Sequence, residues 1–222
     1  MKRNRICLSF SLACLTSQLS GTTPLFAANL PDDCEVVPGS FCVASSVDTE
    51  KKQVDVTIYA FVDKVSYPTL GDVTGKYFAF ERWPEYAQNS QVIKFSASTA
   101  TPAYTPGQYN YTHHSDYKIF PDLPVIGRAS GQSVTADTVY KKAESQDADL
   151  LVKFAVDLSK SKGVNFQEGS IAVSEKADHF LVVLQSSVRP ALPAGLGLNF
   201  AAQATKEANM DMLTGMFQLQ GQ

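Results

Sequence analysis

The sequence predicts an α+β fold in which a curved antiparallel sheet of about six to seven strands wraps around one long C-terminal helix. A strand-like segment comes first, two short helical stretches follow it, and about six more strand-like segments lie between residues 91 and 188. A helical apolar period then extends over residues 194–219. Helices gathered at the two ends of a run of strands favour a sheet that buries one face against the long helix.

The first strand is predicted for residues 53–65, where polar or aromatic residues alternate with the aliphatic residues Val54, Val56, Ile58, Ala60 and Val62. Between residues 66 and 88, apolar residues recur at helical spacing until Pro84, which lacks a backbone donor. This pattern predicts two short helices. Trp83, the only tryptophan, stands directly before Pro84 and is interpreted either as a plug of the core or as an aromatic contact for a ligand.

The later segments alternate with turn residues. Pro102 and the pair Pro106-Gly107 separate the next two strands, and short polar turns join the following ones as antiparallel neighbours. Strands are predicted for residues 91–98, 108–120, 134–142, 150–158, 164–173 and 180–188. In the closing helix, one face gathers Leu198, Ala201, Ala202, Thr205, Ala208, Met212, Leu213, Met216 and Leu219.

Three stretches carry a resemblance to a known superfamily: VDVTIYAFVDKV, FERWPEYAQNSQVIKF and FLVVLQSSVRPALPAGLGLNFAAQATKEANMDMLTGMFQL. In element order, in Trp-Pro-x-Tyr before the second strand and in Leu-Pro before the last helix, they resemble the helix-grip superfamily. This superfamily, also called START-like or SRPBCC, includes START lipid-transfer domains, the birch-pollen allergen and bacterial polyketide cyclases. The resemblance implies a helix-grip fold over nearly the whole mature chain, and a cavity under the last helix that holds a lipid, sterol or polyketide.

The first 27 residues are predicted to be a signal peptide. A basic start precedes a mostly apolar run that is too short to cross a bilayer as a helix. A lipoprotein signal that ends at Cys14 is the alternative. Cleavage near Ala28 would export the chain, so the protein is expected to be periplasmic or secreted.

After the signal, residues 28–50 are predicted to form an irregular N-terminal arm and residues 51–222 the START-like domain. Cys34 and Cys42 are the only cysteines that remain after cleavage. In an oxidising compartment they are expected to form a disulfide that staples the arm.

The net charge of the chain restricts the classes of partner that it can bind. The chain has 22 acidic and 19 basic residues, and three of the basic residues lie in the signal peptide. A net negative mature chain without a basic cluster disfavours nucleic acid as a partner. The expected partner is a hydrophobic small molecule or a lipid, while transient membrane contact and the oligomeric state are left open.

Candidate ligand contacts lie on the strand over residues 108–120. Alternation gathers its drier side chains on one face, among them Tyr109, Tyr111, His113 and Tyr117. Facing a cavity, this set could hydrogen-bond a hydroxyl or carbonyl while its rings stack on apolar parts. Alternatively, His113 is a core histidine that bonds a tyrosine hydroxyl, or a general acid or base.

Further candidate contacts come from later segments: Phe166, Arg189, Asn209, Met212 and Met216. The methionines can adapt to ligands of varied shape, or simply fill the core. A buried Asn209 would need a neighbouring partner or a polar group of the ligand. A bulge near Gly169 would bring Phe166 onto the face of the apolar residues that follow.

No catalytic residue, metal ligand or cofactor is assigned, because the sequence contains no GxSxG, HExxH or phosphate-binding glycine loop. The preferred function is therefore an exported binding protein for a lipid-like or other hydrophobic small molecule. A cyclase- or hydrolase-type enzyme that uses His113 is the first alternative. An interaction module whose interior is filled by side chains is the second.

Overall fold

The computed structural model describes residues 30–120, 122–123, 127–128, 131–191 and 197–222. The predicted signal peptide lies outside these residues. Within the described ranges, no helix combines the length and apolar character needed to cross a bilayer.

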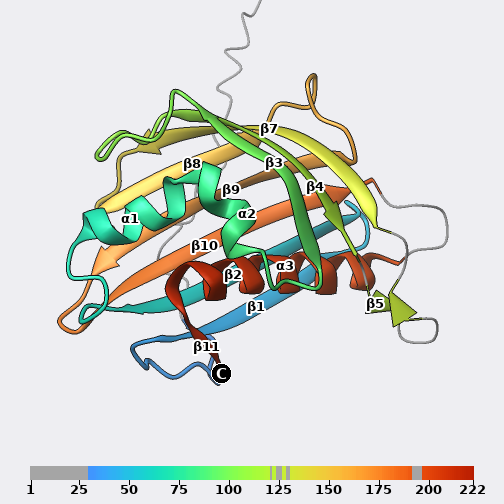
Figure 1. Ribbon diagram of the computed structural model, residues 1–222. Helices are drawn as coiled ribbons and strands as arrows, with labels where there is room; N and C mark the ends of the chain where they lie inside the picture. Colours follow the sequence, from blue (N-terminus) through green and yellow to red (C-terminus); the bar gives the residue numbers. More distant parts are fainter. Residues whose placement is uncertain (1–29, 121, 124–126, 129–130, 192–196) are drawn as a thin grey trace, which may run out of the picture.

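Nine strands form one sheet in the order β11-β1-β2-β10-β9-β8-β7-β4-β3 (Figure 1). Neighbouring strands are antiparallel except β1 and β11, so the sheet is mixed. The nine strands are β1 Ser40–Asp48, β2 Gln53–Asp63, β3 Ile93–Thr101, β4 Tyr111–Ile119, β7 Gln132–Ala143, β8 Leu150–Val156, β9 Val164–Glu175, β10 His179–Pro190 and β11 Gln220–Gly221. A separate pair is formed by β5 Asp122–Leu123 and β6 Gly127–Arg128.

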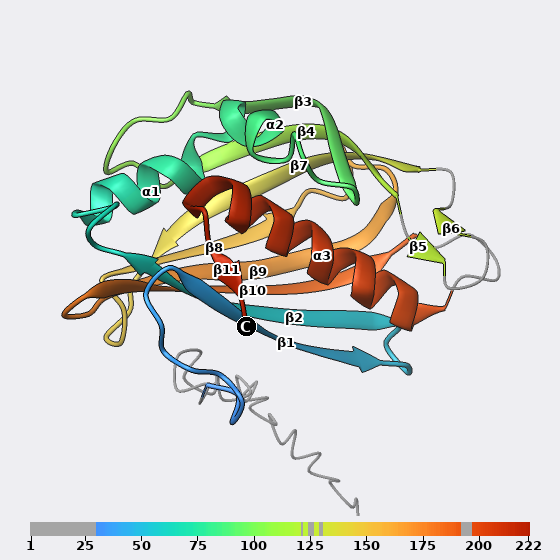
Figure 2. The same ribbon diagram turned by 60° about the horizontal axis from the view of Figure 1, so that its bottom comes forward.

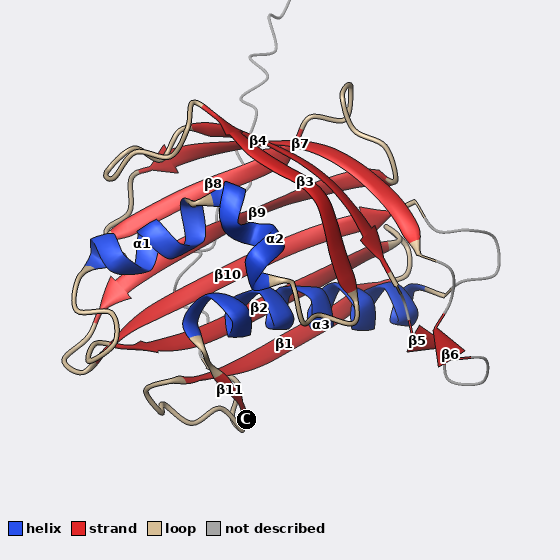
Figure 3. Ribbon diagram, in the orientation of Figure 1, coloured by secondary structure: helices blue, strands red, loops and turns tan. Residues whose placement is uncertain are grey.

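Helices cover the concave face of this sheet (Figure 3). They are α1 Leu70–Phe78, the 3₁₀ turn η1 Phe80–Arg82, α2 Trp83–Tyr86 and α3 Leu198–Phe217. Thr69 and Asp72 form a capping box that starts α1. Pro84 lies in the first turn of α2, where its missing donor costs no hydrogen bond, so it begins the second short helix.

Helix α3 lies along the inner face of the sheet, against β1 and β2 (Figure 2). At the other edge, β7, β4 and β3 curl over the helix. The helix-grip arrangement is therefore confirmed, with α3 as the predicted C-terminal helix and the predicted strands at β2, β3, β4, β7, β8, β9 and β10.

The N-terminal arm differs from the prediction. Residues 40–48 are not irregular but form β1, which pairs with β2 along its whole length. The sheet therefore has nine strands instead of six or seven, and the short helices follow its second strand instead of its first. Alternation fails in β1 because Ser40, Phe41 and Cys42 are buried in succession. Here α3 covers one face of the strand and the arm covers the other.

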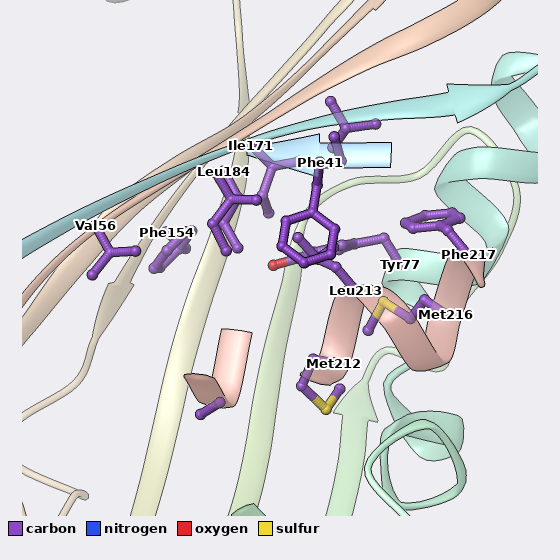
Figure 4. Close-up of a cluster of buried hydrophobic side chains, with 14 of the residues drawn as sticks. Phe41, Val56, Tyr77, Phe154, Ile171, Leu184, Met212, Leu213, Met216 and Phe217 are labelled. Carbon is purple, nitrogen blue, oxygen red and sulfur yellow. The ribbon is translucent and has the colours of Figure 1, made fainter. Parts of the chain in front are cut away.

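The main core fills the space between sheet and helix (Figure 4). The aliphatic face of β2 is almost wholly buried, as the alternation over 53–65 predicts. Figure 4 shows Phe41 and Tyr77 between side chains of the sheet and of α3, which include Ile171, Leu184, Leu213 and Met216.

A smaller apolar cluster covers part of the convex face. It contains Tyr59, Phe61 and Val183 from the sheet, with Leu30 and Cys34 of the arm packed against them. Cys34 and Cys42 are joined by the expected disulfide, with their Cα atoms 5.8 Å apart. The disulfide thus holds the arm against the outer surface of the sheet.

The sheet bends without the expected bulge near Gly169. From Phe166 to Glu175, β9 keeps an unbroken register with β10, and the shift lies between Arg189 and Pro190 instead. At Gly169 an added Cβ would collide with the carbonyl oxygen of Gln185 and the ring of Phe154. Gly169 is therefore required for the close approach of Phe154 and of the β10 backbone, and not for a bulge.

Helix α3 touches α2 through Gly215, where an added Cβ would collide with the backbone carbonyl of Tyr86. We expect Gly215→Ala to destabilise the protein by about 1–3 kcal/mol, because overpacking forces the helices apart. Helix propensity alone would give the opposite sign, a gain of about 1 kcal/mol. Urea unfolding measures the difference in free energy.

Gly71→Ala in α1 is the matched control, because its nearest atom, Thr69 Oγ1, lies 3.5 Å from the added Cβ, an ordinary contact. It should leave stability unchanged or raise it. A Gly215→Ala protein as stable as wild type would contradict the close approach of α2 and α3.

Candidate functional site

A cavity of about 120 Å³ lies between the sheet and α3. Its aromatic wall consists of Tyr77, Trp83, Phe95, His113, Tyr117, Tyr140 and Phe154. Its aliphatic wall consists of Ile93, Ile119, Ala136, Leu184, Val188, Ala208 and Met212. The remaining lining residues are polar but uncharged: Ser115, Thr138, Gln167, Ser186, Thr205 and Asn209. None of the described lining residues carries a formal charge at neutral pH.

A second cavity of about 60 Å³ adjoins the first beneath the N-terminal half of α3. The two share wall residues, among them Tyr117, Gln167 and Thr205. Phe200, Ala201 and Ala204 of the helix complete its roof.

His113 is held rigidly in the wall. Its Nε2 lies 2.9 Å from the hydroxyl of Ser98, which itself donates to the carbonyl oxygen of Phe80 at 2.5 Å. The hydroxyl has only one proton, so His113 Nε2 carries a proton and donates it to Ser98. The imidazole also stacks on Phe80, with ring centroids 4.3 Å apart.

Burial, with a smaller effect from the neighbouring His114, lowers the pKa of His113 to about 3. The ring is therefore neutral at physiological pH. Trp83 packs edge-on against it with centroids 4.7 Å apart, and donates its indole N–H to the carbonyl oxygen of Tyr77 at 2.9 Å. Trp83 thus packs against the core and also lines the cavity, while its contact with a ligand stays a prediction.

His114 points the other way and forms no part of the cavity wall. Its Nδ1 lies 2.6 Å from Asp137, and its Nε2 lies 3.5 Å from Asp116. The hydrogen bond to Asp137 and the charges of both carboxylates raise its pKa. Among the described residues, no group of three or more acidic, histidine or cysteine side chains is arranged to hold a metal ion.

Three tyrosines of the wall make no hydrogen bond through their hydroxyls to any described residue: Tyr77, Tyr117 and Tyr140. Burial raises the pKa of all three phenols, that of Tyr117 to about 12. The negative charges that Tyr77 and Tyr117 carry when ionised add to the rise in the pKa of Tyr140. The three phenols remain protonated and can act as donors.

The helix contributes Asn209 and Met212 to the wall. Asn209 Nδ2 donates to the carbonyl oxygen of Thr205 at 2.9 Å, so a neighbouring backbone group satisfies the donor. Met216 is buried one turn further along and lies in the core beyond the cavity.

Four of the nine predicted ligand contacts therefore line the cavity: His113, Tyr117, Asn209 and Met212. Tyr109 and Tyr111 are on the predicted face but pack against Phe78, with centroids 5.4 and 6.1 Å away. The hydroxyl of Tyr111 donates to the carbonyl oxygen of Gln108 at 2.6 Å, which makes it a structural residue.

Phe166 and Arg189 were misplaced by the sequence analysis, because both lie on the convex face. Arg189 sits over the Phe166 ring, 4.8 Å from its centroid, and donates to Gln53 Oε1 at 3.3 Å. Strict alternation puts Val188 and Gln167 into the cavity, so their neighbours Arg189 and Phe166 point outward. The expected bulge would have been needed to reverse Phe166.

The sequence analysis missed Tyr77, Tyr140 and Ser186. Alternation along β7 carries the signal for Tyr140, because Val134, Ala136, Thr138 and Tyr140 share one face. Ser186 shares a face of β10 with Leu184 and Val188. For Tyr77 no pattern was available, because its position depends on how α1 packs on the sheet.

Comparisons with known proteins agree on the fold. No family model and no curated protein matches the sequence. A STAR-related lipid transfer protein from Xanthomonas axonopodis superposes with a TM-score of 0.50 and 14% identity, over 83% of this chain and 95% of that one.

Two further solved structures are similar. A START superfamily protein from Mycobacterium smegmatis has a TM-score of 0.44 and 13% identity, over 75% of this chain and 94% of that one. The di-domain ARO/CYC protein StfQ from the steffimycin biosynthetic pathway has a TM-score of 0.49 and 12% identity, over 77% of this chain and 52% of that one. The chain has the START-like, helix-grip fold.

Proposed function

We propose that this protein is an exported binder of an uncharged, lipid-like or otherwise hydrophobic small molecule, which it encloses between the sheet and α3. The observation that carries the proposal is the cavity of about 120 Å³ in the middle of the fold, walled by aromatic and aliphatic side chains. A START-like fold shared with a lipid transfer protein supports it.

The size of the cavity limits what the closed form can hold. An apolar cavity of about 150 Å³ accepts benzene, so one ring or a short chain is the natural guest here. A larger lipid would require α3 to move, because drug-sized ligands occupy roughly 300–1,000 Å³.

Movement of α3 would begin at its N-terminal half. The C-terminal half is fastened by Ser90, whose hydroxyl donates to Asp211 at 2.5 Å, and by Tyr67, which donates to the carbonyl oxygen of Met216 at 3.2 Å. The N-terminal half instead roofs the second cavity. Gly197 caps α3 with a φ of −80°, which any residue adopts, so this position supplies no special hinge.

The enzyme alternative loses its main support at His113. General acid or base catalysis works best when the pKa lies near the working pH, and the pKa of His113 is lowered to about 3. The filled-interior alternative conflicts with the cavity itself.

Protein purified gently from its native source should carry an extractable, uncharged hydrophobic compound, which mass spectrometry identifies. Adding that compound to the stripped protein at about 100 times its Kd should stabilise it by about 2.7 kcal/mol, a shift of several degrees in Tm. Ala208→Leu should fill the cavity and abolish the shift while the protein stays folded. An empty native protein with no shift across a panel of neutral ligands would refute binding.

The two adjacent histidines should titrate differently in an NMR experiment. His113 should show no titration between about pH 5 and pH 9, whereas the midpoint of His114 should lie above its ordinary value of about 6.5. The stability that His114 contributes is present below about pH 6.5 and is lost as the pH rises through its raised pKa. For His113 the sign is opposite, since stability falls as the pH drops from about 6.5 toward 3. A His113 midpoint near neutrality would restore the enzyme alternative.

Export is testable separately. Expression of the full chain in a bacterium should yield a periplasmic or secreted product that begins near Ala28 and has an oxidised Cys34–Cys42 pair. Mass spectrometry with and without a reducing agent measures both. An uncleaved cytoplasmic product would contradict export and leave the binding proposal intact.

A further inference from the structure

Four hydroxyl groups from four different elements border the cavity without a hydrogen-bond partner in the described part of the chain. They belong to Tyr77 of α1, Tyr117 of β4, Tyr140 of β7 and Ser186 of β10. The oxygen of Ser186 is fully buried as well as unpartnered. Buried hydroxyls normally find a partner, so the unpartnered oxygen of Ser186, beside three tyrosine hydroxyls that make no hydrogen bond, requires an explanation.

Register explains how two of these hydroxyls come to face the same space. Tyr140 pairs with Phe154, Phe154 with Gly169, and Gly169 with Ser186, so all four residues lie in one row across the sheet. Gly169 has no side chain, and the ring of Phe154 lies over it. Phe154 thus occupies the place of the missing side chain, and Tyr140 and Ser186 flank this pair on the same face of the sheet.

The residues that line the cavity also determine which charge a ligand can carry. Tyrosine and serine hydroxyls can donate to an oxygen atom, but the described wall contains no cation that could pair with a carboxylate or phosphate. Arg189, the cation among the candidate ligand contacts, lies on the opposite face of the sheet. Burying an unpaired ionised group costs far more than burying a neutral carbonyl.

We propose that the cavity recognises an uncharged ring compound that bears a carbonyl or another acceptor oxygen, to which the hydroxyls of Tyr77, Tyr117, Tyr140 and Ser186 donate. This inference rests on the proposed binding function and narrows its ligand class. Each carbonyl oxygen accepts up to two hydrogen bonds, so four donors suit one or two such oxygens. The aromatic wall packs against the ring, and the cavity volume admits one ring.

Three probes of similar size separate the contributions: cyclohexanone, methylcyclohexane and cyclohexanecarboxylate. Binding of each to wild type is measured by calorimetry or by the shift in Tm. We expect cyclohexanone to bind more tightly than methylcyclohexane, and the carboxylate not to bind. Tyr140→Phe and Ser186→Ala should each weaken cyclohexanone binding by roughly five- to tenfold and leave methylcyclohexane unaffected.

Tyr59→Phe is the control variant. Tyr59 is buried on the convex face, away from the cavity, so this change should alter the binding of no probe. Stability of the free protein supplies a second readout. If the hydroxyls serve a ligand and not the fold, Ser186→Ala should leave Tm unchanged or raise it, because it removes an unpartnered buried hydroxyl. Tyr140→Phe should leave Tm unchanged, because it removes a hydroxyl that bonds no described residue.

The outcomes distinguish the two proposals. If methylcyclohexane and cyclohexanone bind equally well, and the variants change neither, the hydroxyl array has no role in recognition although the cavity binds. If the carboxylate binds best, the uncharged class is wrong. If no probe binds wild type and no native ligand is found, the binding function itself fails. A clear loss of Tm in both variants would make the hydroxyls structural and overturn the inference.

Discussion

A single long helix, α3, packs along the concave side of a sheet of nine strands, and the rest of the structure depends on this difference in width. Helix α3 packs against β1 and β2, so the half of the sheet beyond β10 must curl toward it to bury its own apolar face. Two glycines, one in the sheet and one in α3, allow neighbouring groups to approach the backbone closely. Gly169 lets the ring of Phe154 pack directly on the backbone of β9, and Gly215 lets α3 lie against α2.

The cavity follows from the same difference in width. Side chains from β4, β7 and β10 converge on α3 but do not fill the space beneath it completely, and short residues of the helix such as Ala208 leave part of it open. Filling the region with larger residues would add stability through burial. Its uncharged lining, which includes tyrosine and serine residues, instead suits a ligand that is mostly apolar and carries a polar atom.

The pattern of the sequence predicted most of the fold, because periodicity reports which face of an element is dry. The periodicity placed β2, β4 and α3 well, since each has one face that is more buried than the other. It failed for β1, where both faces are covered near Ser40, Phe41 and Cys42. It also could not give the cavity its size or supply Tyr77, which depend on the angle at which helices pack.

The candidate site residues show the same limit: periodicity identifies the buried face of a strand but not what that face contacts. His113 and Tyr117 were found because alternation places them on the buried face, but alternation alone cannot separate them from Tyr109 and Tyr111, which share that face and pack into the core. Phe166 was misplaced because the curvature of β9 was attributed to an inserted residue. The register instead remains regular there, and Gly169 leaves room for the ring of Phe154.

Trp83 gives this molecule a built-in optical reporter. It is the only tryptophan among the 222 residues, its indole nitrogen is fixed by the Tyr77 carbonyl, and its ring borders the hollow interior. Fluorescence excited at the indole absorption band therefore originates from a single position in the wall. Changes in its emission wavelength or quenching would follow what enters or leaves that interior, with no label attached to the chain.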